Sequence, residues 1–151
     1  MLSTLRVLRR RGVLGLNRRN AEFISLCNPR RLYPLVDDKV RTKSLAAEAG
    51  ITVPELYGVV TTQHDAGELG QLLEGREDFV IKPAHGSGGS GILVICGRQR
   101  SRFRKTDDRL IDGEELLHHV SNTLSGLYSL GGQRDEAMIE YRVHHDPVFE
   151  Q

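Results

Sequence analysis

The sequence has no tryptophan, only two cysteines, and no hydrophobic run close to the roughly 20 residues that span a bilayer. Cys27 and Cys96 are far apart and match no metal-binding spacing, so we expect reduced thiols in the cytoplasm. The first 20 residues lack any acidic residue, and arginines interrupt each apolar stretch there. This pattern excludes the hydrophobic region of a secretory signal, although an arginine-rich organelle transit peptide stays an alternative.

The formal net charge of +1 hides two halves of opposite sign. Residues 1–43 carry eleven basic and three acidic side chains, whereas the remaining residues carry ten basic and seventeen acidic ones. Such a basic end can attract RNA, acidic lipid or an acidic substrate. No aromatic residue lies between Arg6 and Arg19, so the stacking platform of a single-strand binder is missing. A solvated basic helix face is the simpler interpretation.

The length of 151 residues and the 38% hydrophobic content suit one globular domain with its own core. Apolar periodicity, capping residues and glycine stops predict the order of its elements. These are two short basic helices near residues 2–8 and 21–27, a helix over 37–49 capped by Asp37, a strand over 56–60, a helix over 62–74, antiparallel strands over 79–83 and 92–96, an exposed polar excursion over 98–109, a helix from the Asp112/Glu115 capping box to about residue 130, and a strand over 136–143.

The most informative segment is the glycine loop, which we define as residues 86–91. It consists of Gly86, Ser87, Gly88, Gly89, Ser90 and Gly91. Glycines let backbone N–H groups point into one concavity, so phosphate is the expected ligand, and a flexible hairpin tip is the alternative. Ile92 and Leu93 follow the loop, where a Walker A motif needs lysine and a hydroxyl residue. A dinucleotide-binding fingerprint is also disfavoured, because a strand follows the loop instead of a helix.

Lys82 lies inside the apolar strand that precedes the glycine loop. A buried ammonium group needs an anionic partner, and a nucleotide phosphate over the loop would supply one. The alternative is that the long side chain reaches water from the edge of a strand.

Together these residues resemble the ATP-grasp ligases. The resemblance rests on Lys82-Pro83 followed by the glycine loop, on Asp38-Lys39 upstream of Gly50-Ile51-Thr52-Val53-Pro54, and on Ile139-Glu140-Tyr141. Within the superfamily the chain is most similar to the RimK-related alpha-L-glutamate ligase-like proteins, through residues 14–20, 28–39 and 139–143.

The resemblance implies an α/β (α+β) ATP-grasp fold that is incomplete here. We expect a basic helical segment over residues 1–36, an N-terminal α/β part over 37–76, and the lid subdomain with the hinge strand over 77–151. The Mg²⁺ ligands of the family would follow residue 151, so we assign no catalytic and no metal-binding residue. We also expect that such a fragment is inactive alone.

The resemblance further implies the roles of single residues. Lys39 and Lys82 would contact ATP phosphates, and the glycine loop would close over them. Glu140, Tyr141 and Val143 would hold adenine, and Glu150 lies where the family binds ribose. The implied reaction is ATP-dependent amide formation through an acylphosphate, with an amino-acid or peptide substrate, glutamate by resemblance alone. The alternatives are a nucleotide-binding pseudoenzyme and a basic interaction module, and we expect no membrane partner.

The remaining polar residues carry weaker expectations. Asp135, Glu136 and Asp146 occupy no family metal position. The neighbouring pairs His118-His119 and His144-His145 lack helical ligand spacing, so we interpret them as surface residues. His85 could touch phosphate because it adjoins the glycine loop.

Overall fold

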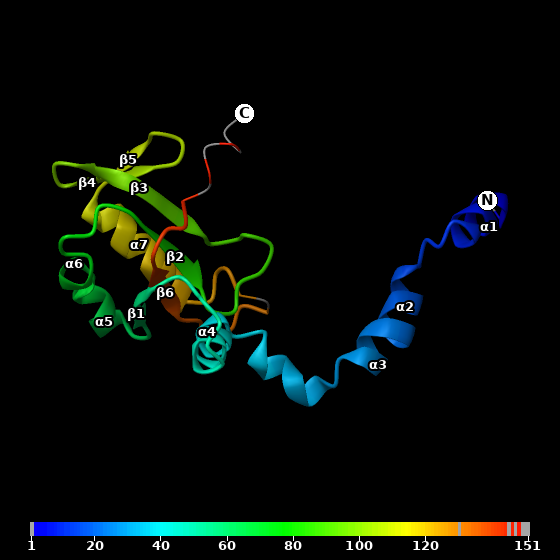
Figure 1. Ribbon diagram of the computed structural model, residues 1–151. Coiled ribbons are helices and arrows are strands. Elements are labelled where there is room, and N and C mark those ends of the chain that lie inside the picture. Colours follow the sequence, from blue (N-terminus) through cyan, green and yellow to red (C-terminus); the bar gives the residue numbers. More distant parts are fainter. Residues whose placement is uncertain (1, 130, 145, 147, 149–151) are drawn as a thin grey trace. The chain divides into compact units, whose positions relative to one another are not determined.

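A computed structural model describes residues 2–129, 131–144, 146 and 148 of the chain (Figure 1). The chain divides into two units, Met1–Asp37 and Asp38–Gln151, each of which is described by itself. Among the described residues, no helix is both long and apolar enough to cross a membrane.

The first unit consists of short helical segments. They are α1 (Leu2–Arg10), α2 (Leu16–Arg18), the π-helical turn η1 (Arg19–Ile24), α3 (Ser25–Cys27) and the 3₁₀ segment η2 (Arg30–Leu35). Helix α1 is followed by Gly12, which has a φ of 78°. Glycine adopts this left-handed conformation at little steric cost, so it suits the end of a helix. None of the described residues of this unit is buried. The second predicted basic helix is present, but it contains the π-helical turn η1 and has no buried face.

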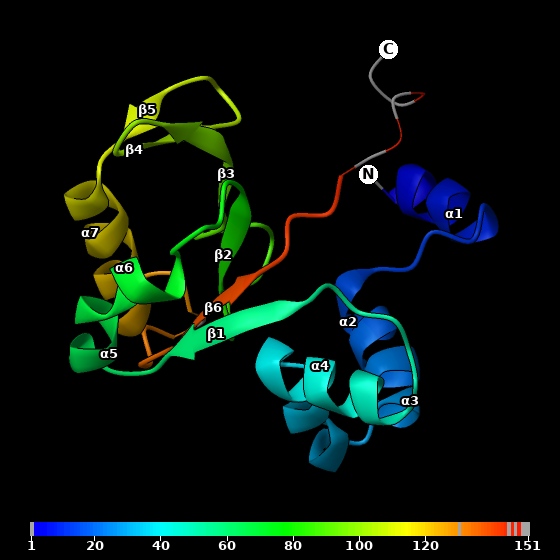
Figure 2. The same cartoon turned by 60° about the vertical axis from the view of Figure 1, so that its left-hand side comes forward.

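The second unit is built on a six-stranded antiparallel sheet with the strand order β1-β6-β2-β3-β4-β5. The strands are β1 (Leu56–Val60), β2 (Phe79–Pro83), β3 (Leu93–Gln99), β4 (Arg102–Lys105), β5 (Leu110–Ile111) and β6 (Ala137–Glu140). The mixed α/β class and the antiparallel β2–β3 hairpin around the glycine loop are as the sequence predicts. The last strand, β6, lies between β1 and β2, so the first and last strands of the second unit pair with each other at one edge of the sheet (Figure 2).

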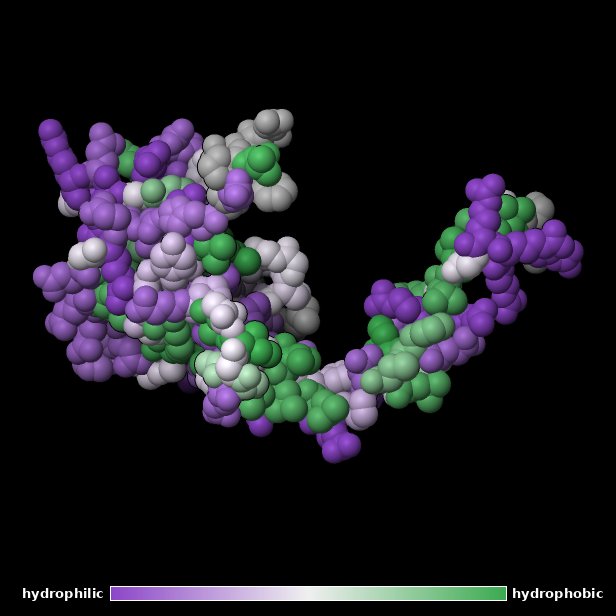
Figure 3. All heavy atoms as spheres, in the orientation of Figure 1, coloured by the Kyte–Doolittle hydropathy of each residue, from purple (hydrophilic) through white to green (hydrophobic). Residues whose placement is uncertain are grey.

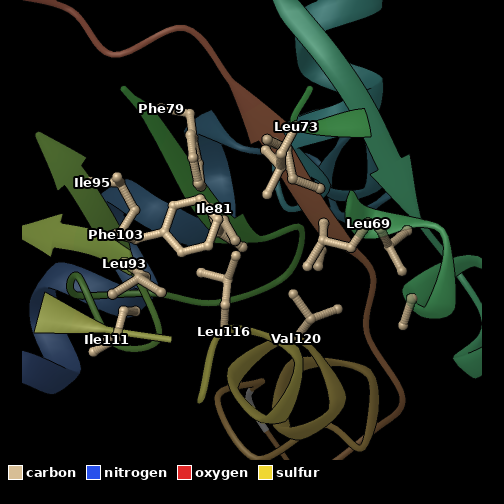
Figure 4. Close-up of a cluster of buried hydrophobic side chains, with 14 of the residues drawn as sticks. Leu69, Leu73, Phe79, Ile81, Leu93, Ile95, Phe103, Ile111, Leu116 and Val120 are labelled. Carbon is tan, nitrogen blue, oxygen red and sulfur yellow. The ribbon is translucent and has the colours of Figure 1, made fainter. Parts of the chain in front are cut away.

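One face of the sheet carries the hydrophobic core. Helices α5 (Gln63–Gly67), α6 (Leu69–Leu72) and α7 (Gly113–Leu124) lie on this side of the sheet in Figure 2. Figure 4 shows Leu116 and Val120 of α7 pointing toward Ile81 and the neighbouring strand residues. Phe79, Ile81, Ile95 and Ile139 are fully buried there. The alternation of a strand then sends Val80, Lys82, Met138 and Glu140 to the opposite face.

Capping residues explain where the helices of this unit begin. The Asp112 carboxylate accepts from the Glu115 amide at 2.9 Å, and the Glu115 carboxylate accepts from the Asp112 amide, so the predicted capping box of α7 is present. Helix α4 (Lys39–Glu48) has its N-cap one residue later than predicted. Its cap is Asp38 and not Asp37, because the Asp38 carboxylate accepts from the amides of residues 40 and 41.

Four further predicted boundaries were wrong. The helix predicted over 62–74 is two short helices, because the chain breaks its regular hydrogen bonding at Glu68. The predicted polar excursion over 98–109 instead contains the end of β3 and all of β4, whose alternation buries Phe103 and exposes its neighbours. Helix α7 ends at Leu124, because Gly126 takes a positive φ of 84° against the backbone of the following loop. Strand β6 covers four residues of the predicted 136–143.

Candidate nucleotide site

The candidate site lies on the face of the sheet opposite the core. Its centre is what we call the Glu140 cluster: Glu140 on β6, Lys82 on β2 and Lys43 on α4. One carboxylate oxygen, Oε2, is 2.8 Å from Lys43 Nζ, and the other, Oε1, accepts from Lys82 Nζ. The side chain of Glu140 is 3% exposed, that of Lys43 10% and that of Lys82 29%. The buried carboxylate thus forms ion pairs with two lysines, which compensate its negative charge.

This cluster corrects the argument that Lys82 requires a phosphate. Its anionic partner is Glu140 on the adjacent strand β6. The two side chains lie on the same face of the sheet, because the register pairs Val80 with Glu140 and Lys82 with Met138. An ammonium group has three donors, and the side chain of Lys82 is still part exposed. Lys82 therefore retains the capacity to bind a further anion, although the ion pair removes the need for one.

Lys39 opens helix α4 and holds the start of the glycine loop. Its Nζ donates to the carbonyl oxygen of Ala84 at 3.1 Å and to that of Gly86, and its backbone N–H donates to Ala84 O at 3.0 Å. Burial lowers the pKa of Lys39, with Lys82 adding to this effect and Asp135 and Asp38 opposing it. The positive charge of Lys39 is therefore poorly solvated and would be stabilised by an approaching anion.

Asp135 is a site residue that the sequence argument missed. Its side chain is 0% exposed and accepts from the backbone N–H of His85 at 3.0 and 3.2 Å and from the amide of Glu136 at 2.8 Å. The Nδ1 atom of His85 lies 2.8 Å from Asp135 Oδ1. These bonds fix both the backbone and the ring of the residue that precedes the glycine loop, and leave Nε2 as the outer ring nitrogen. No local sequence pattern predicts this contact, because 50 residues separate His85 and Asp135.

The glycine loop itself is exposed at its tip and held at its ends. Gly88, Gly89 and Gly91 all have positive φ values, between 62° and 80°. Apart from two turn hydrogen bonds, Ser90 N–H to Ser87 O and Ile92 N–H to Gly89 O, the tip is free to present its amides. At the end of the loop Gly91 lies so close to the Tyr128 ring and to Pro83 that a Cβ atom there would be 2.7 Å from Pro83 Cγ.

His119 of α7 anchors the same end of the loop. Its Nε2 atom lies 3.0 Å from the Gly91 carbonyl oxygen, and its ring lies 5.4 Å from that of Tyr128. Burial lowers its pKa, and the Gly91 carbonyl opposes this. The interpretation of His119 as a surface residue was therefore wrong, whereas His118 is exposed.

The second unit thus combines a glycine loop, a lysine on the strand that leads into it, a second lysine bonded to its start and a buried carboxylate on the neighbouring strand. The family model described as sugar-transfer associated ATP-grasp matches residues 18–151. The chain belongs to this ATP-grasp family. Neither a curated protein nor a solved structure matches it.

The ATP-grasp chain does not bring all its predicted site residues together. Lys82 pairs with Glu140, and Lys39 bonds to the start of the glycine loop. Tyr141 and Val143 follow the end of β6 and are 41% and 65% exposed. The Tyr141 amide donates to Glu55 O, which continues the pairing of β6 with the segment before β1. Glu150 lies outside the described residues.

The described part of this ATP-grasp chain offers no group of three side chains that could hold a metal ion. Asp135 is occupied by hydrogen bonds to the backbone, and His144 lies 2.9 Å from the Asp78 carboxylate, which Arg142 also approaches. His145 is outside the described residues. Lys43 is a further member of the site that was missed, although its spacing of four residues from Lys39 places both on one helix face.

Proposed function

We propose that the chain binds ATP on the face of the sheet that carries Lys39, Lys82 and the glycine loop, for an ATP-dependent ligase reaction. The observation that carries the proposal is that Lys39 bonds to the start of the exposed glycine loop, while buried Glu140 holds Lys82 on the strand that leads into this loop. The charge of Lys39 is poorly solvated and the side chain of Lys82 is part exposed, so both lysines can bind an anion. The family match supports ATP as that anion.

We infer a role for each site residue. Lys39 and Lys82 bind the phosphates, because Lys39 bonds to the start of the loop and Lys82 lies on the strand that leads into it. Gly86, Ser87, Gly88, Gly89, Ser90 and Gly91 supply backbone N–H groups to them. Glu140, Tyr141 and Val143 form the adenine side of the site, at the end of β6.

The proposed reaction activates a carboxylate. The carboxylate oxygen attacks the γ-phosphorus of ATP and ADP leaves; an amine then attacks the acyl carbon, the amide C–N bond forms, and phosphate leaves with loss of the amine proton. Lysines and loop amides contribute by positioning the phosphates and neutralising charge that develops on them. Mg²⁺ would neutralise phosphate charge in such a transfer, and the described residues offer no group of three side chains that could hold it.

The resemblance to RimK-related proteins supports an amino-acid or peptide substrate of the glutamate type, and we propose this substrate class. The family description adds an association with sugar transfer. The two fit one chemistry, in which the product amide links an acyl group to an amine carried by a sugar or an amino acid.

Thermal unfolding with and without ATP tests the nucleotide site. At an ATP concentration of about 100 times the dissociation constant, binding stabilises the folded state by about 2.7 kcal/mol. This corresponds to a rise in Tm of roughly 6–10 °C. Lys82→Met should remove most of the rise, because it deletes one phosphate contact and leaves Glu140 paired with Lys43.

Lys105→Met is the matched control, since Lys105 lies on β4 and contacts Asp107 instead of the Glu140 cluster. It should keep the ATP-induced rise. An unchanged Tm of the parent chain in saturating ATP, or an equal loss of the rise in both variants, would contradict the assignment.

A further inference from the structure

The segment before the residues matched by the ATP-grasp family exposes an aliphatic surface. Residues 4–16 precede the match, which begins at residue 18. Leu5, Val13 and Leu16 are 62%, 52% and 66% exposed, and Leu8 and Leu14 are about two-fifths exposed. With Val7, which is 49% exposed, six of these thirteen residues are exposed aliphatic residues, more than the single exposed leucines that are normal on a protein surface.

Four of these side chains gather around one hollow. It has a volume of about 500 Å³ and is lined by Leu5, Leu8, Val13 and Leu16, with Arg9 and Arg18 among its remaining lining residues. Figure 3 shows hydrophobic and hydrophilic side chains next to one another over this N-terminal unit. The apolar surface is therefore concave, and guanidinium groups border it.

The charges around the hollow have one sign. Arg6, Arg9, Arg10 and Arg11 are exposed, and the first acidic residue of the chain is Glu22. Glu22 pairs with Arg18 at 2.6 Å. Within the described part of the chain, the four arginines of α1 and its end have no carboxylate partner. Unpaired cations next to exposed aliphatic side chains are complementary to an anionic headgroup above an acyl chain.

We propose that residues 4–16 bind the surface of an anionic phospholipid membrane, with the aliphatic side chains in the interface and the arginines at the headgroups. An acidic protein would complement the charge of the arginines, but it would not account for the aliphatic hollow. RNA would match them too, but residues 1–22 contain no aromatic side chain on which a base could stack. The proposal departs from our sequence-based expectation that no membrane takes part, because surface binding needs no spanning helix.

The absence of tryptophan allows a direct test with the full chain. Leu8→Trp places a single fluorophore at the hollow, and Leu127→Trp places one at a leucine that is 64% exposed in the second unit. With phosphatidylglycerol vesicles, emission of the Leu8→Trp protein should move to shorter wavelength, and that of Leu127→Trp should not. Both residues are exposed, so neither change disturbs the core.

The charge requirement is tested by co-sedimentation with the same vesicles. Replacing Arg9 and Arg10 by Gln should weaken partitioning roughly thirtyfold, since each basic residue near an anionic surface contributes about a factor of five. The control replaces Arg100 and Arg102, which are exposed in the second unit, and should leave partitioning unchanged. Phosphatidylcholine vesicles should not sediment the protein.

Three outcomes would overturn the proposal. They are an unchanged emission of the Leu8→Trp protein on phosphatidylglycerol, equal loss of binding in the two arginine variants, and binding to poly-glutamate or RNA without a wavelength shift on vesicles. The last outcome would assign the segment to a soluble polyanion instead.

Discussion

Replacing Glu140 by Gln tests how much the buried cluster contributes to stability. The substitution keeps the shape of the side chain but leaves Lys43 and Lys82 without their shared anion. Removing one partner of a buried ion pair costs about 3–5 kcal/mol. We expect a value near the lower end, about 3 kcal/mol, because the side chain of Lys82 is 29% exposed and water screens its charge.

The expected loss is large compared with the total stability of a domain, about 5–15 kcal/mol. Urea unfolding of parent and variant measures it, and Tm should fall by roughly 10 °C. Lys82→Met alone should cost about 1 kcal/mol or less, since Glu140 keeps Lys43.

The Glu140→Gln/Lys82→Met double variant shows whether unpaired lysines cause the loss of stability. If the loss in Glu140→Gln comes from unpaired buried cations, adding Lys82→Met removes one of them and should restore part of the stability. A coupling energy of about 1 kcal/mol or more between the two sites is expected. The reasoning would be refuted if the two effects simply add, or if Glu140→Gln unfolds at the same urea concentration as the parent.

Two further predictions concern the end of the glycine loop. Gly91→Ala should lower stability by about 1–3 kcal/mol in urea unfolding, because φ is 76° and the new Cβ would enter the space of the Tyr128 ring. The pKa of His119 is lowered from 6.5, mainly by burial and also by Lys105 and His118. The unfolded state therefore binds the proton more readily than the folded state. Stability should fall as pH drops below about 6.5 and level off below the folded-state pKa of His119. His119→Gln should flatten this dependence of stability on pH.

Both predictions have matched controls. Gly88→Ala lies in open space at φ 62°, so it should show the backbone strain alone and cost less than Gly91→Ala. His118→Gln changes an exposed neighbour and should leave most of the pH slope in place. Equal costs at the two glycines, or equal slopes in the two histidine variants, would contradict the packing described at the loop.

The sequence by itself determined the features that depend on neighbouring residues. The capping box of α7, the hairpin around the glycine loop and the placement of Lys82 on a strand follow from local hydrogen bonding and from alternation. Lys39, Lys82 and Glu140 were predicted as site residues, and the structure pairs Lys82 with Glu140 and bonds Lys39 to the start of the loop. The part that the glycine loop and these residues play in binding stays a prediction until ATP is tested, as does the three-part division of the chain.

Only the tertiary structure decided which charges meet. The partner of Lys82 is Glu140, 58 residues further along the chain, and the partner of the His85 amide is Asp135, 50 residues further along. No periodicity encodes such contacts, because they depend on β6 pairing between β1 and β2. The strand boundaries over residues 98–105 were likewise decided by pairing, since β4 is polar in sequence and forms against β3 with Phe103 in the core.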